Sequence, residues 1–410
     1  MVSPRLDDSW IGVLRRIRGR SGSPRSNWTG PLGLIVILIG VPVVGGCAGS
    51  GGAPPTAIEG TARAPFPQTR LVSDGERESF LGSRACVTCH PKQAGQLASR
   101  HARTLQEVDP KFHGPLFAAG KSKQDPLDEL TFHTAFEDGA CVLKATDESG
   151  AAKDQATAQY VFGSGAIGYT YVSYSKGKPI QLRLTHFAGP GKWDFTPGQS
   201  MGGGSNSALG EILQPNGERM CFSCHSTALV KRGEELDLKK SILGVGCETC
   251  HGPGKAHVAA VNARSPDLKM ARLSTIRNQL SMELCGQCHR APANISMQGP
   301  GMAAQLPRLQ GIALSRSGCY LTGGVTCFTC HEPHEDATAV SRAAHNGKCS
   351  SCHSGSDSRQ IVCRTQPQGD CVSCHMPAQD VGMPTGPRFH NHWIKVWTTD
   401  SANRPLSLPE

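Results

Sequence analysis

Cys221-Phe222-Ser223-Cys224-His225 is the first of six copies of one pattern, Cys-x-x-Cys-His, that follow one another as far as His375. A seventh copy, Cys86-Val87-Thr88-Cys89-His90, stands alone upstream. Numbered in chain order, the seven motifs begin at Cys86, Cys221, Cys247, Cys285, Cys327, Cys349 and Cys371. Each motif places an imidazole directly after two thiols, and this arrangement is the attachment signal of c-type haem.

The spacing has a chemical reason. Two cysteines three apart lie on one face of a helical turn, where their thiols can add to the vinyl groups at one porphyrin edge. Half of a zinc site or a thioredoxin-like redox pair also contains Cys-x-x-Cys, but neither requires a His at the next position every time. We therefore predict seven covalent haems, with zinc as the alternative. The predicted attachment residues are Cys86, Cys89, Cys221, Cys224, Cys247, Cys250, Cys285, Cys288, Cys327, Cys330, Cys349, Cys352, Cys371 and Cys374.

The apolar supply of the chain is small, since 38% of its residues are hydrophobic and 5% are aromatic. Six motifs between Cys221 and His375 leave roughly 26 residues for each haem, too few for a side-chain core beneath every one. We expect a multihaem cytochrome c fold in which short helices and coil pack around covalent haems. A small antiparallel β insert is expected between the first and second motifs.

The expected organisation is an export signal over residues 1–46, a flexible tether over 47–79, a first haem segment over 80–127, the β insert over 128–206, a six-haem domain over 207–400 and a tail over 401–410. The signal combines an Arg-rich start with the apolar run Pro31–Gly46, which is short for a membrane span. It ends in Val-Gly-Gly-Cys47, similar to a bacterial lipoprotein cleavage box. We predict a lipid on Cys47 and a periplasmic or cell-surface location; the alternative is an uncleaved anchor or ordinary cleavage nearby.

The formal net charge of +9 does not indicate nucleic-acid binding. Residues 1–46 carry six Arg against Asp7 and Asp8, so removing the signal leaves +5. Haem propionates add negative charge, and the mature protein should be near neutral or acidic.

Two local patterns describe the first half of the chain. Ala94, Leu97, His101, Leu105 and Val108 recur at spacings of three and four, which predicts an amphipathic helix over 91–108 with His101 facing inward. In the insert, apolar residues alternate with polar ones over 180–184, and residues 175–178 form a plausible hairpin turn.

The chain has enough histidines for two at every iron. Seven of the 16 lie in the motifs and are the predicted proximal ligands: His90, His225, His251, His289, His331, His353 and His375. The nine others are His101, His113, His133, His186, His257, His334, His345, His390 and His392. An iron held by two imidazoles suits electron transfer, whereas a five-coordinate iron can bind a small molecule. No Cys-x-x-Cys-Lys occurs, which weakens the enzyme hypothesis without excluding it.

Two cysteines outside the motifs, Cys319 and Cys363, could form a disulfide around the fifth and sixth haems in an exported protein. Two free, buried thiols are the alternative.

From about Phe80 to Trp397 the chain resembles the multihaem c-type cytochromes related to the tetrahaem cytochromes of nitrification, pentahaem nitrite reductase and octahaem hydroxylamine oxidoreductase. The matching segments are 82–103, 221–228, 244–258, 324–334 and 371–377. The resemblance implies closely stacked haems and supports distal-ligand roles for His101, His133, His257, His334 and His392. His345, just before the sixth motif, is a further candidate ligand.

We expect electron transfer between membrane-linked donors and other redox proteins as the function. The competing hypothesis is a multihaem oxidoreductase acting on small nitrogen or sulfur species at one five-coordinate haem, because relatives include both carriers and enzymes.

Overall fold

The structure is a computed structural model that describes residues 71–397, apart from 126, 128, 176–177, 190, 200–206, 274–275, 277, 293–304, 356–361, 364, 366–368 and 382–387. The chain divides into two units, Met1–Ala62 and Arg63–Glu410, and every described residue belongs to the second. The predicted export signal, Cys47, most of the predicted tether and the predicted tail therefore lie outside the described residues.

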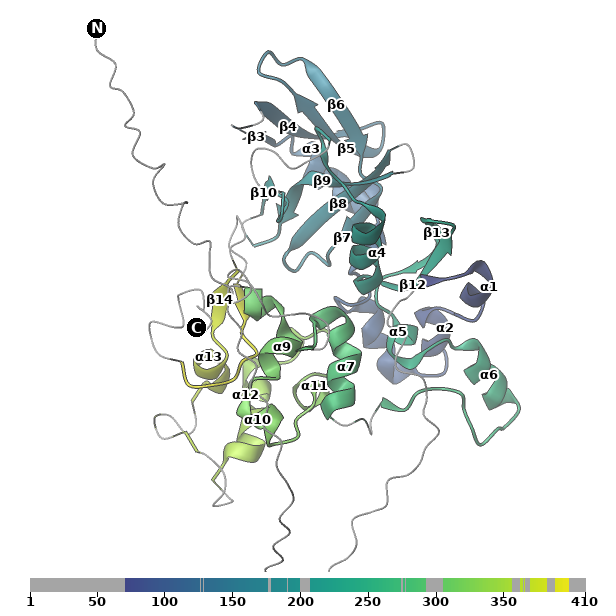
Figure 1. Cartoon of the computed structure of the whole chain (residues 1–410), viewed down its shortest axis with the longest axis vertical. Coiled ribbons are helices and arrows are strands. Elements are labelled where there is room, and N and C mark those ends of the chain that lie inside the picture. The colour runs from purple at the N-terminus through teal and green to yellow at the C-terminus, as the bar shows by residue number, and fades with distance from the viewer. Residues whose placement is uncertain are drawn as a thin grey trace, which may run out of the picture. The chain divides into compact units, whose positions relative to one another are not determined.

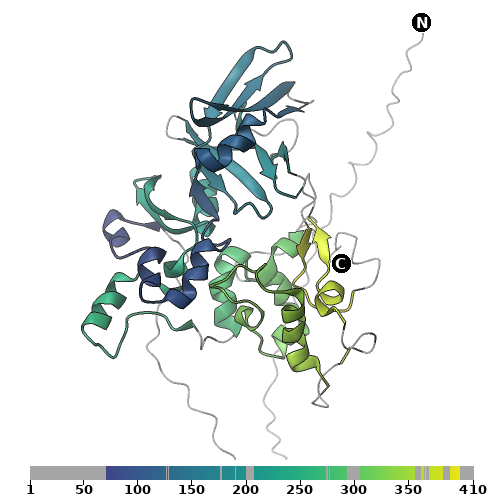
Figure 2. The same cartoon turned by 180° about the vertical axis from the view of Figure 1, so that it is seen from behind.

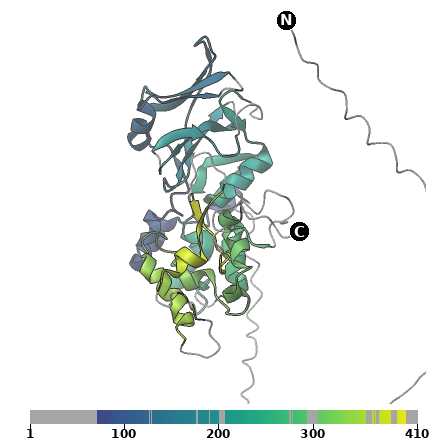
Figure 3. The ribbon, with the colours of Figure 1, turned by 90° about the vertical axis from the view of Figure 1, so that its left-hand side faces the viewer.

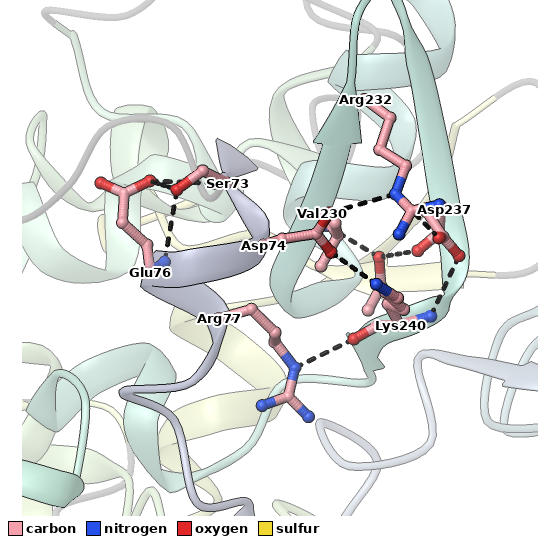
Figure 4. Close-up of polar contacts among 9 residues, drawn as sticks. Ser73, Asp74, Glu76, Arg77, Val230, Arg232, Asp237 and Lys240 are labelled. Carbon is pink, nitrogen blue, oxygen red and sulfur yellow. Dashed lines mark hydrogen bonds and ion pairs between the residues drawn. The ribbon is translucent and has the colours of Figure 1, made fainter.

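The last part of the predicted tether is ordered structure, which corrects its boundary at residue 79. Strand β1 (Leu71–Val72) pairs in parallel with β12 (Ser226–Arg232), whose antiparallel partner is β13 (Glu235–Leu243). Helix α1 (Asp74–Arg77) starts with a capping box between Ser73 and Glu76. Asp74 then accepts hydrogen bonds from Arg232 (3.2 Å) and Lys240 (2.9 Å), as Figure 4 shows. These contacts to distant residues hold the segment in place.

The helix predicted over 91–108 is wrong in its second half. Helical structure ends with the 3-10 helix η1 (Pro91–Ala98), and β2 (Leu105–Glu107) is a strand. Leu105 pairs with Phe162 on β7 and is only 1% exposed, so sheet pairing and burial outweigh the helical spacing of the apolar residues.

Between the first and second motifs, one sheet has four antiparallel strands in the order β3-β4-β5-β6. Their bounds are β3 Ser122–Asp125, β4 Leu130–Glu137, β5 Ala140–Thr146 and β6 Ala152–Thr157. Helix α3 (Pro110–Ala118) packs on β4 and β5, and Figure 2 shows it crossing in front of the strands.

A second sheet of six strands follows the order β10-β9-β8-β7-β2, with β11 also paired to β9. Its further bounds are β7 Tyr160–Phe162, β8 Gly168–Ser175, β9 Lys178–Phe187, β10 Lys192–Phe195 and β11 Gly210–Ile212. Ser175 pairs with Lys178, while the two residues between them lie outside the described part. Antiparallel strands are thus present as predicted, but in two sheets that are larger than the small one expected.

Most of the buried apolar side chains lie in these sheets. The largest cluster contains Phe117, Phe132, Leu143, Tyr171 and Leu182, and a second joins Leu105 and Val172 to Phe222, Leu229 and Leu238. After the third motif the only cluster formed by described residues is small, with Leu306, Ile312 and Ala313 at its centre. Side chains alone therefore provide little interior for the motif-rich part of the chain.

Every motif lies on or at the end of a short helix (Figure 1). In chain order the helices are α2 (Ser83–Val87), α4 (Pro215–Cys224), α5 (Cys247–His251), α7 (Asn278–His289), α11 (Cys327–Cys330), α12 (Arg342–His353) and α13 (Cys371–His375). The remaining elements are α6 (Lys255–Asn262), η4 (Leu306–Arg308), α9 (Gln310–Leu314), α10 (Gly318–Leu321), β14 (Ala378–Asp380) and β15 (Arg388–His390). No helix within the described ranges combines the length and apolar character needed to cross a membrane.

Candidate haem-binding site

In three motif histidines a backbone carbonyl contacts the Nδ1 atom and so fixes the orientation of the ring. The Nδ1 atoms of His225, His251 and His375 lie 3.0, 3.1 and 2.9 Å from the backbone carbonyls of Thr104, Ala271 and Lys395. An Nδ1–H bonded to a carbonyl leaves Nε2 as the lone-pair nitrogen, and this second contact is the usual partner of a metal-bound imidazole. The motif helices therefore present imidazoles prepared to bind iron through Nε2.

Four motif imidazoles face a second imidazole from elsewhere in the chain. The ring centroids are 6.4 Å apart for His90 and His257, 6.1 Å for His289 and His101, 6.2 Å for His251 and His334, and 6.2 Å for His331 and His392. A metal ion between two imidazoles holds their centroids about 6 Å apart, since each metal–nitrogen bond is about 2 Å and each nitrogen about 1 Å from its centroid. These residues therefore fit an iron bound between each pair.

The second imidazoles are oriented in the same way. His257 Nδ1 lies 2.8 Å from the carbonyl of Leu268, and His392 Nδ1 lies 3.0 Å from that of His390. His334 Nδ1 instead contacts the carboxylate of Glu332 at 2.5 Å. A carboxylate partner increases the basicity of the opposite nitrogen more than a carbonyl does, which strengthens His334 as a ligand.

Burial keeps several of these rings neutral, as metal binding requires. It lowers the pKa of His225, His251 and His331 below the ordinary value. Burial, with a smaller effect of the neighbouring His331, lowers the pKa of His392 to about 4. The neutral imidazole is therefore the stable form of these side chains near neutral pH.

Six of the seven motifs are arranged in three pairs. The first cysteines of the paired motifs lie close together: Cys86 beside Cys247, Cys285 beside Cys327, and Cys349 beside Cys371. The corresponding helices contact one another: α2 with α5, α7 with α11, and α12 with α13, the last two in yellow-green and yellow in Figure 3. We call these pairs of motifs, numbered in chain order, the 1–3, 4–5 and 6–7 pairs.

The pairs are themselves in contact. His251 of the third motif faces His334, which follows the fifth motif, so the 1–3 pair lies beside the 4–5 pair. Helix α11 contacts α12, which joins the 4–5 pair to the 6–7 pair. The motifs thus form one continuous series in the order 1, 3, 4, 5, 6, 7, which differs from the order along the chain.

The second motif stands outside the three pairs. Its Cys224 thiol contacts the carbonyl of Gln287, inside the fourth motif, at 3.8 Å. His225 is half-buried and makes an edge contact with Phe162 at 5.0 Å between centroids. Among the described residues no second imidazole faces His225 as one does in the four pairs of rings. This motif therefore forms a branch beside the fourth one.

Other predicted ligands occupy different positions. His133 lies on β4, where its two ring nitrogens contact the hydroxyls of Ser122 (2.8 Å) and Thr146 (3.0 Å), and the structure does not bring it to a motif. The ring centroid of His345 lies 5.8 Å from that of His331, and the His331 ring also faces His392. His375 is not stacked on another imidazole in the described part of the chain, and its Nδ1 contacts the carbonyl of Lys395.

The predicted disulfide is absent, since no bond joins Cys319 to Cys363. Cys319 lies close to Cys330 and Cys352, and therefore beside the fifth and sixth motifs. Burial raises the pKa of its thiol.

Among the residues that the structure describes, no three His, Cys, Asp or Glu side chains converge as ligands for one metal ion.

A family described as cytochrome c554 and c-prime matches residues 202–252, which contain the second and third motifs. This match supports a multihaem c-type cytochrome. The crystal structure of the outer cell wall cytochrome OcwA is similar over 77% of this chain and 80% of its own, at 16% identity. The TM-score is 0.42, below the level that establishes a common fold. No curated protein matches the chain.

The candidate haem-binding motifs were visible in the sequence, but several residues that organise them were not. Ser83, Glu248, Ser281 and Asn346 form hydrogen bonds from one motif helix to another. Their only sequence signal is a polar residue inside a motif or one helical turn before it, which is too common to be informative.

Proposed function

We propose that this chain is an exported electron-transfer cytochrome that carries seven covalent haems, one on each motif. The observation that carries the proposal is the continuous series of paired motifs with imidazoles facing one another. Haem supplies one-electron chemistry when bound, and iron with two imidazole ligands keeps its coordination when its charge changes. The residues of the chain attach, orient and space the haems.

In this proposal His257, His334, His101 and His392 are the distal ligands opposite His90, His251, His289 and His331. Three of the four follow a motif other than the one they face, and His392 comes from the C-terminal segment, so each of them ties distant parts of the chain together. Electrons would pass along the order 1, 3, 4, 5, 6, 7 to other redox proteins. The location would be the periplasmic or cell-surface side, with a lipid on Cys47 as the membrane anchor.

The direct test is purification of the mature protein followed by absorption spectroscopy and intact-mass measurement. We expect a Soret band and a mass that exceeds the lipidated polypeptide by seven haems. A colourless protein, or one that contains zinc in place of iron, would refute the proposal. Electron paramagnetic resonance of the oxidised protein should then show low-spin ferric haem for at least the four motifs with facing imidazoles.

A second candidate function is favoured by the surroundings of His225. A haem on the second motif would have Phe162, and no stacked imidazole from the described residues, beside its proximal ligand. A five-coordinate iron can bind a small nitrogen or sulfur species, which suits an oxidoreductase. Added nitrite, hydroxylamine or cyanide should convert one high-spin haem to a low-spin one. If all haems are low-spin and none of the three ligands changes the spectrum, this activity is excluded.

A further inference from the structure

The three motif pairs share a contact that is independent of haem. In each pair a polar side chain from the segment of one motif accepts a hydrogen bond from a backbone N–H in the first turn of the other motif's helix. Ser83 Oγ accepts from Cys247 N at 3.0 Å, Ser281 Oγ accepts from Cys327 N at 3.3 Å, and Asn346 Oδ1 accepts from Val372 N at 3.1 Å. The first N–H groups of a helix have no acceptor within the helix, so these side chains satisfy them from outside.

The three acceptors occupy equivalent positions. Ser83 and Asn346 lie three residues before the first cysteine of their motifs, and Ser281 lies four residues before its own. Spacings of three and four place a side chain on the same helical face as the cysteine that follows. Each acceptor is therefore on the face whose cysteine sulfur touches the paired motif, and the contact acts beside the point of haem attachment.

The 1–3 pair adds a reciprocal contact through Glu248, which lies inside the third motif. Its carboxylate is 3% exposed and accepts three hydrogen bonds of 2.8 Å, from the backbone N–H groups of Leu81, Gly82 and Gly254. The first two of these N–H groups directly precede α2, the helix of the first motif. Hydrogen bonds to a charged acceptor are stronger than those between neutral groups, so this is the firmest of the contacts.

The close approach of the first and third motifs also needs a glycine. A Cβ atom at Gly246, the residue before Cys247, would collide with the hydroxyl of Ser83 and come within 3.2 Å of Thr227 Oγ1. A larger residue at this position must therefore displace the Ser83 hydroxyl, which accepts the hydrogen bond from Cys247 N.

We propose that Ser83, Glu248, Ser281 and Asn346 are positioning residues that set the separation of the paired haems. The proposal rests on the proposed function. The motif cysteines attach each haem, but nothing in a thioether bond fixes the distance to the next haem. These hydrogen bonds fix that distance by joining the two attachment helices, and electronic coupling between haems falls steeply with their separation. The second motif has no such contact among the described residues, in agreement with its position outside the pairs.

The experiment uses the full-length holoprotein and compares Glu248→Ala and Ser281→Ala with the wild type. Haem content and the number of low-spin haems should be unchanged, because no attachment residue or ligand is altered. Circular dichroism in the Soret region reports coupling between neighbouring haems. We expect a loss of coupling amplitude in each variant, together with a shift in the potentials of the two haems of the affected pair during reductive titration.

Matched controls alter polar side chains that bond within their own motif helix. Thr88 Oγ1 donates to the carbonyl of Ala85 at 2.7 Å, and Ser351 Oγ donates to that of Lys348 at 2.8 Å. Thr88→Ala and Ser351→Ala should leave the Soret dichroism and the potentials at wild-type values. Gly246→Ala, which keeps every hydrogen-bonding group, should reproduce the loss seen in Glu248→Ala.

The outcomes separate this proposal from the proposed function. Wild-type Soret dichroism in both Glu248→Ala and Ser281→Ala would overturn the positioning role while leaving the haem count intact. An equal loss of Soret dichroism in Thr88→Ala and Ser351→Ala would also overturn the positioning role. If Ser281→Ala fails to assemble, Ser281→Thr, which retains the hydroxyl, must restore the haem content and the coupling; a Thr variant that assembles without coupling counts against the proposal. A wild-type protein without haem would refute the proposed function itself.

Discussion

The imidazole rings of His251 and His334 are nearly parallel, with an angle of 14° between their planes and 6.2 Å between their centroids. His251 belongs to the third motif, whereas His334 follows the fifth motif, 83 positions later in the chain. The iron of one haem would therefore be bound by residues from two distant segments. In the proposed function distal ligation is a tertiary contact, and each proposed ligand can be tested separately.

Replacing His334 with alanine should convert one low-spin haem to a high-spin haem, because it removes the imidazole opposite His251. Electron paramagnetic resonance of the oxidised protein measures the change. His133→Ala is the control, since both nitrogens of His133 contact hydroxyl groups of the β sheet. An unchanged low-spin signal in His334→Ala would contradict the assignment of this ligand.

His392 and His345 both lie near His331, and we expect only His392 to bind the iron on the fifth motif. The His392 ring is stacked on that of His331, and its Nδ1 is held by the carbonyl of His390. His392→Ala should therefore create a high-spin haem, while His345→Ala should leave the haem of the fifth motif low-spin. The same spectroscopic measurement distinguishes them, and a high-spin fifth haem in His345→Ala alone would reverse the assignment.

The buried ion pair between Arg183 and Asp125 should be critical for the β sheets. The two side chains are 1% and 0% exposed. Replacing Asp125 with alanine removes the carboxylate that neutralises the guanidinium, which typically costs about 3–5 kcal/mol of unfolding free energy. Hydrogen exchange of the β4 and β9 amides should accelerate accordingly. The double variant Asp125→Leu, Arg183→Met should recover much of the loss, and protection equal to wild type in Asp125→Ala would disprove the role.

Glu218 should make the stability of the protein depend on pH. Burial raises its pKa above the ordinary value of 4.5, although the Tyr174 hydroxyl donates a hydrogen bond to its carboxylate at 2.6 Å. A raised pKa in the folded state gives stability that is fully present below pH 4.5 and is lost as the pH rises through the folded value. Thermal unfolding between pH 4.5 and neutral should therefore show a decrease in Tm to which this residue contributes.

Glu218→Gln keeps an acceptor oxygen for Tyr174 and removes the charge. Its Tm should decrease less over the same pH range and should exceed that of the wild type at neutral pH. Glu283→Gln is the control, since Glu283 accepts only an exposed hydrogen bond from Gln279 on its own helix. Parallel pH curves for the wild type and Glu218→Gln would show that Glu218 does not cause the dependence.

Local sequence patterns predicted elements well where neighbouring residues determine the structure. The alternation of Ile180, Leu182 and Leu184 corresponds to strand β9, where all three side chains are buried. The helix predicted from the spacing over 91–108 was wrong beyond Ala98, because Leu105 pairs with β7, which is more than fifty residues away in the chain. Periodicity describes which residues share a face, but the partner that covers the face decides between helix and strand.

By itself, the sequence predicted the chemistry proposed for this protein, because each Cys-x-x-Cys-His motif is complete within five consecutive residues. The tertiary structure alone decided which imidazoles face one another, which motifs form pairs and which motif stands apart. These relationships join segments such as α2 and α5, whose cysteines Cys86 and Cys247 are 161 positions apart. Spacing along the chain carries no information about such contacts, since they depend on how the intervening strands bring the segments together.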